Sequence, residues 1–175
     1  MKLFSSIRLL LISLWLGSAV FFIGVAQVAF AVLPQRELAG AVVGRSLEIL
    51  NYCGMAIGVL MLLSSLAGSK LTNKFSLWIE RFLLLLLTAA CAGGQFVIGF
   101  WMASVRGQMG RPIDELAADD PLRVQFNTLH AYSAWVLLTA MAAALIVFFL
   151  VANRKFSATA AAKSDIYDFS KEFKT

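Results

Sequence analysis

Four long stretches of this 175-residue chain contain no charged residue. They run from Leu9 to Gln35, Ile49 to Ser69, Phe82 to Val105 and Val124 to Asn153. Each provides the ~20 residues that a helix needs to cross about 30 Å of hydrocarbon. The composition agrees, because 60% of the residues are hydrophobic and 14% are charged, which lies outside the range of soluble domains. We therefore expect a lipid bilayer to surround most of the chain.

Lipid offers the backbone no hydrogen-bond partners, so each stretch must form a helix unless the chain builds a closed barrel. Runs such as "RFLLLLLTAA" lack the alternation of a barrel strand. The sequence therefore predicts an all-α membrane protein with four transmembrane helices in a domain of residues 1–155. The predicted spans are about 8–33, 40–69, 77–105 and 123–152, followed by a polar tail at 156–175. The first apolar run is longer than the 7–15 residues typical of a secretory signal, so we expect it to remain as a helix.

The positions of the lysines predict the orientation. All seven lie near the N-terminus, in the second connection or in the tail, and the first and third connections contain none. Because positive residues near span ends favour the cytoplasmic side, we expect both termini and the tail to be cytoplasmic, in a bacterial inner membrane. Short connections predict an antiparallel up-down-up-down bundle. The net charge of +5 fits this orientation, so we expect no nucleic-acid partner.

Small and polar residues recur along each span at the three- and four-residue spacing that shares one helix face. They include a G-x-x-x-G pair at Gly54 and Gly58, which favours close helix packing. At 1.5 Å per residue, several polar side chains lie roughly 10–16 Å below the outer surface. We therefore predict an outward-facing polar cluster as a binding region, made of Gln27, Arg45, Glu48, Asn51, Gln95, Arg106, Arg123, Asn127 and His130.

Some of these residues have two interpretations. Arg45 and Glu48 can pair at i and i+3, either buried in the bilayer or at its interface. His130, the single histidine of the chain, is either a hydrogen-bonding group that joins helices or a proton carrier or soft-metal ligand. Cys53 and Cys91 lack a C-x-x-C pattern and are either small apolar packing residues or, with His130, metal ligands.

Three motifs occur in a familiar order: "LWLGSAVFFIGVAQVAF", "AGAVVGR" and "RVQFNTLHAYS". With them, the chain from about Leu9 to Leu150 resembles the family of small four-helix membrane proteins that includes transmembrane protein 205. The most specific part of the resemblance is Arg123, Phe126, Leu129 and His130, followed by Ser133. The resemblance implies a four-helix fold and, where this family has been given a role, a link to resistance toward soft-metal drugs of the platinum type.

Three function classes follow from these observations. The first is binding or translocation of a small cation or soft-metal species by the polar cluster. The second is a structural or accessory subunit that associates with other membrane subunits or with itself, since small-residue stripes also serve packing. An enzyme or redox carrier fits least, because one histidine cannot ligate haem twice and no C-x-x-C-H or Gly-rich phosphate loop is present. We therefore expect no catalytic activity and no cofactor.

Overall fold

The computed structural model describes residues 2–67 and 74–153, and these residues are helical apart from short connections. The elements are α1 (Lys2–Val32), α2 (Arg36–Ala67), α3 (Lys74–Ala92), the π-helix η2 (Gly93–Gly99), α4 (Phe100–Met109), the 3₁₀ turn η3 (Ile113–Glu115) and α5 (Pro121–Ala152). Because α3, η2 and α4 follow one another without a break, they form a single rod. The described residues contain four candidate membrane spans, at Ser5–Val32, Arg36–Leu66, Lys74–Met109 and Pro121–Ala152.

The prediction of four apolar helices packed as a bundle is confirmed. The helices begin earlier than the predicted spans, since α1 begins at Lys2 and α3 at Lys74, so that Arg8 and Glu80 lie inside their helices. The second connection up to residue 73 and the predicted tail lie outside the described residues.

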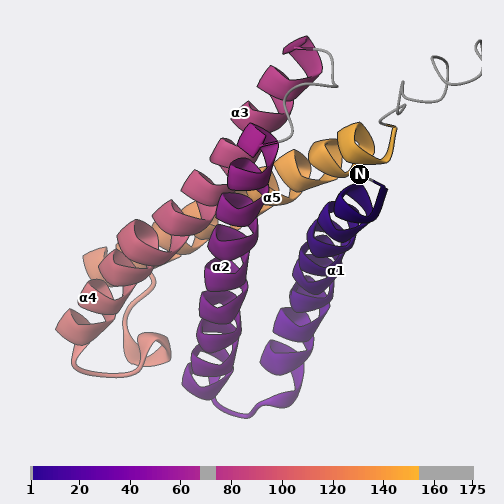
Figure 1. The fold of residues 1–175 in the computed structure, drawn as a ribbon. Coiled ribbons are helices and arrows are strands. Elements are labelled where there is room, and N and C mark those ends of the chain that lie inside the picture. The colour runs from indigo at the N-terminus through magenta and orange to yellow at the C-terminus, as the bar shows by residue number, and fades with distance from the viewer. Residues whose placement is uncertain (1, 68–73, 154–175) are drawn as a thin grey trace, which may run out of the picture.

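Successive helices run in opposite directions, and the N-terminus lies beside the last turns of α5 (Figure 1). We call this the termini end, and the opposite end, with the connections at 33–35 and 110–120, the loop end. Around the bundle, α1 packs against α2 and α5, and α3 packs against the same two helices. Each helix therefore has two neighbours in a closed ring.

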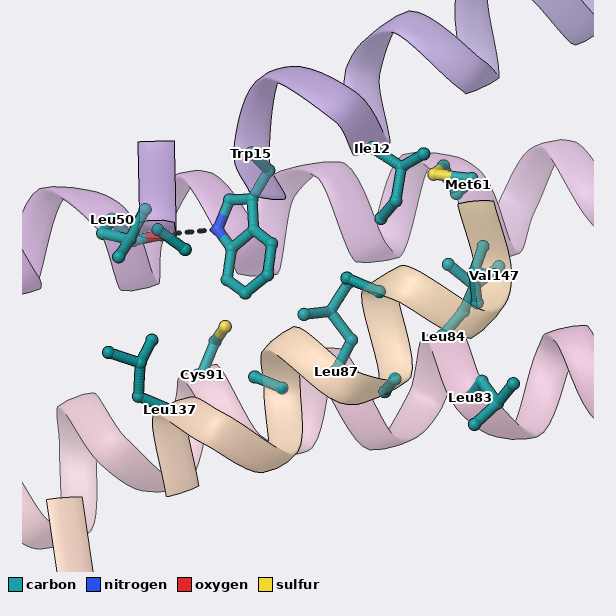
Figure 2. Packing of buried hydrophobic residues seen from close by; sticks show 14 of the residues in the cluster. Ile12, Trp15, Leu50, Met61, Leu83, Leu84, Leu87, Cys91, Leu137 and Val147 are labelled. Carbon is teal, nitrogen blue, oxygen red and sulfur yellow. Dashed lines mark hydrogen bonds between the residues drawn. The ribbon is translucent and has the colours of Figure 1, made fainter. Parts of the chain in front are cut away.

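One apolar core fills the half of the bundle toward the termini end, with buried residues from all four spans. Ile12 and Trp15 of α1 meet Met61 of α2 and the leucines of α3 there, as Figure 2 shows. The indole Nε1 of Trp15 donates a hydrogen bond of 3.0 Å to the carbonyl of Leu50, which joins α1 to α2. This half is therefore a continuous four-helix core.

The G-x-x-x-G pair of α2 lies in this core. A Cβ atom at Gly54 would lie 2.5 Å from the Cys91 sulfur and 2.7 Å from Trp15 Nε1. A Cβ atom at Gly58 would overlap the Thr88 hydroxyl of α3. The small residues therefore let α1, α2 and α3 approach closely, as the spacing predicted.

Toward the loop end the packing divides between two helix pairs. Ala29 of α1 packs with Ala39 and Val43 of α2. A separate cluster joins α4, α5 and the connection between them through Val105, Met109, Leu116 and Leu129. The core that unites all the spans therefore does not continue through the described residues at this end.

Candidate functional site

Arg45 and Glu48 lie on the outside of α2. Arg45 Nη1 is 2.5 Å from Glu48 Oε2, and the two side chains are 75% and 30% exposed. The i and i+3 spacing therefore forms the predicted pair, and the structure places it at the surface of the bundle.

Arg106 and Arg123 hold the loop end together. The Arg106 guanidinium carbon lies 5.1 Å from the centre of the Phe126 ring, and its Nη2 would be 3.3 Å from a Cβ atom at Gly40. Arg106 of α4 therefore contacts both α5 and α2. Arg123 Nη1 donates to the Leu116 carbonyl at 2.7 Å and so fixes the third connection.

Asn51 is the predicted site residue that the bundle buries most deeply, with 6% of it exposed. Its amide faces the π-helix, where a Cβ atom at Gly94 would lie 3.5 Å from Asn51 Nδ2. Gln95, half-buried, belongs to the same π-helix. The wide i→i+5 turn of a π-helix is rare and occurs frequently at functional sites. Asn51 and Gln95 therefore belong to one region of the structure.

Gln27, Asn127 and His130 lie outside this region, and all three are exposed. The reason is helix rotation, since successive residues turn by about 100° around the axis. Ala29 and Leu129 take the buried positions, so Gln27 and Asn127, two residues away, lie on the opposite sides of their helices. The structure therefore does not bring all nine polar residues together in one region. Whether any of them binds a ligand stays a prediction.

The two cysteines belong to different helices, Cys53 to α2 and Cys91 to α3, and lie in different surroundings. Cys91 is buried against Trp15 and Gly54, whereas Cys53 is exposed and lines an apolar groove of about 360 Å³ between α1 and α2. His130 is exposed on α5. Among the described residues, no three His, Cys, Asp or Glu side chains are close enough to hold a metal ion.

The structure also shows a buried ion pair that sequence analysis missed. Arg8 of α1 and Glu80 of α3 are 3% and 0% exposed, and Arg8 Nη2 contacts Glu80 Oε1. The same Nη2 donates to the Met61 carbonyl of α2 at 3.4 Å. Within the described part of the chain, Arg8 Nε has no hydrogen-bond partner. The predicted spans 8–33 and 77–105 contain both residues, but no pattern in the sequence indicated that the two side chains would pair.

A second arginine lies beside this pair. Arg81 of α3 donates from Nε to the Ser65 hydroxyl at 3.1 Å and from Nη2 to the Ser65 carbonyl at 2.8 Å. Ser65 is buried near the end of α2. Polar contacts near the termini end therefore join α3 to both α1 and α2.

Comparison with protein families gives a match over much of the chain. Residues 10–111, more than half of the chain, match the sequence model described as domain of unknown function DUF4149. The matched region begins in α1 and ends just after α4, so it includes Glu80, Asn51 and the π-helix. No curated protein and no solved structure matches the chain.

Proposed function

This chain belongs to the DUF4149 family, and we propose that it is a non-enzymatic accessory subunit of a bacterial inner-membrane assembly. In this proposal its loop-end half contacts a helix of another subunit or of a second copy. Its termini face the cytoplasm, as the distribution of the lysines indicates. Within the family, the motif order of the sequence supports a relationship to the transmembrane protein 205-like proteins.

The exposed position of His130 is the observation that carries this proposal. His130 lies nine residues after Pro121, the first residue of α5, or roughly 14 Å along the helix. An imidazole that faces hydrocarbon is unfavourable, and such residues usually face protein or a water-filled space. A partner helix that covers this face would supply a hydrogen-bond partner, and Asn127, one turn earlier, would be covered with it.

Photo-cross-linking in native membranes tests the proposal. A photoreactive residue at Ala131, exposed beside His130, should give one discrete cross-linked product. The same residue at Leu145, which is exposed in the other half of α5, serves as the control and should give none. His130→Leu should lower the yield at Ala131 at least threefold. No product at Ala131, together with elution as a single chain in mild detergent, would contradict the proposal.

A second candidate function is binding or translocation of a small cation, with soft metals as the class that the family resemblance suggests. The observation that favours it is Asn51, a buried polar residue whose amide faces the π-helix. Amide and carbonyl oxygens suit hard cations better than soft ones. Binding of a soft metal has less support, because Cys53, Cys91 and His130, the side chains that would hold it, lie apart from one another.

Cation accumulation in cells distinguishes this candidate from the first. If it holds, loss of the protein changes the accumulation of a cation such as K⁺ or Ag⁺, and Asn51→Ala reproduces that change. Thr139→Ala, an exposed position on α5 outside the predicted cluster, is the control and should behave like the unsubstituted protein. Unchanged accumulation and tolerance in cells that lack the protein would remove this candidate.

A further inference from the structure

We propose that the Arg8–Glu80 pair is a lock that keeps the termini end of the bundle closed, so that relative movement of the helices is confined to the loop end. This inference goes beyond the proposed function and does not depend on it. It assigns a role to two charged side chains that the bundle buries almost completely.

The lock connects three helices through one side chain. Arg8 of α1 bonds to Glu80 of α3 and to the Met61 carbonyl of α2 with the same nitrogen. Burying two charges is unfavourable, and removing one partner leaves the other uncompensated in a medium of low dielectric constant. Separating α1 from α3 would take the Glu80 carboxylate away from the buried Arg8 guanidinium. Breaking the pair therefore adds a cost to opening at this end beyond the loss of apolar contacts.

The loop end has no comparable connection among the described residues. Its two apolar clusters join α1 to α2 and α4 to α5, but neither joins the two pairs to each other. Contacts between the pairs include the Arg36–Asp114 ion pair, 3.1 Å long with side chains 66% and 48% exposed. Exposed ion pairs typically contribute less than about 1 kcal/mol. Arg106 of α4 also reaches Gly40 of α2, but it too is exposed. The two helix pairs are therefore joined at this end by exposed polar contacts, which resist separation less than the buried pair does.

The π-helix η2 lies between the four-helix core and the loop-end cluster of α4 and α5. Cys91, just before η2, is the last residue of α3 in the four-helix core, and Val105 of α4 belongs to the loop-end cluster. The π-helix between them begins with Gly93 and Gly94 and ends with Gly99. Glycine adds backbone freedom, and a π-helix replaces the regular i→i+4 bonds. This segment is therefore the joint about which α4 moves relative to α3.

Distance distributions between spin labels in lipid nanodiscs test the lock. One pair of labels, at Leu10→Cys and Phe82→Cys, reports on α1 and α3 near the termini end, and both positions are exposed. A second pair, at Leu38→Cys and Gln108→Cys, reports on α2 and α4 at the loop end. The labels are placed in a Cys53→Ala background, with the buried Cys91 retained. The loop-end distribution should be at least twice as broad as the termini-end distribution.

Substitutions then test the ion pair itself. Glu80→Gln should broaden the termini-end distribution to the width seen at the loop end, and the exchange of Arg8→Glu with Glu80→Arg should narrow it again. Arg36→Ala, which breaks the exposed pair, is the control and should leave the termini end narrow. A termini-end width unchanged by Glu80→Gln would overturn the proposal. Equal widths at the two ends of the unsubstituted protein would also overturn it, and that comparison needs no variant of the pair to fold.

Discussion

At the scale of single residues, Gly54 is a position at which the core has no room for an added side chain. A methyl group there would press on the sulfur of Cys91 and the indole nitrogen of Trp15, both buried in the core. We expect Gly54→Ala to lower the free energy of unfolding by about 1–3 kcal/mol, since overpacking forces neighbours from their positions. Thermal unfolding in detergent measures the effect as a lower melting temperature.

Gly44→Ala, on the same helix, is the matched control. A Cβ atom at Gly44 would have nothing within 4 Å. Inside a helix, alanine is also more favourable than glycine by about 0.8–1.0 kcal/mol. The stability of this variant should therefore be unchanged or slightly higher. Equal destabilisation by the two substitutions would show that the close approach at Gly54 is not what stabilises the bundle.

At the scale of elements, the end of α4 depends on one backbone conformation. Gly110 has φ +63°, the left-handed region that follows many helices and that side chains disfavour. Gly110→Ala should destabilise the protein by about 1 kcal/mol. Gly107→Ala, three residues earlier inside the helix and with open space around it, should not. Similar melting temperatures for the two variants would contradict the assigned role of Gly110.

The existence of the helices was predictable, because apolar length alone determines it in lipid. The burial of Arg8 and Glu80 was not, because sequence alone shows no partner for either, and it is the tertiary contact between α1 and α3 that pairs them. The π-helix was also missed. Its glycines read as packing residues, and nothing in their spacing distinguishes an i→i+5 turn from a regular one.

At the scale of the whole molecule, the sequence predicts how deep a residue lies in the bilayer better than it predicts which way its side chain faces. The rise per residue places Gln27 and His130 toward the outer side, but which way a side chain faces depends on how each helix rotates against its neighbours. Here Ala29 and Leu129 occupy the buried faces, and the polar residues turn outward. Asn51 was predicted correctly as buried, since it shares the face of Gly54 and Gly58, which pack against neighbouring helices.

The whole molecule also makes a prediction about sidedness. The rod from Lys74 to Met109 has 36 residues and is therefore roughly 50 Å long, which exceeds the 40–45 Å of a bilayer with its headgroups. Lys74 at its start and Ala118 in the connection beyond its end, both exposed, should lie in different aqueous compartments. In a Cys53→Ala background, an impermeant maleimide should label Ala118→Cys in cells with a permeabilised outer membrane and an intact inner one. Lys74→Cys should react only after the inner membrane is opened, because lysine-rich connections stay in the cytoplasm. Labelling of both positions from one side would mean that this rod does not cross the bilayer, whereas the reverse order would keep the fold and refute the orientation.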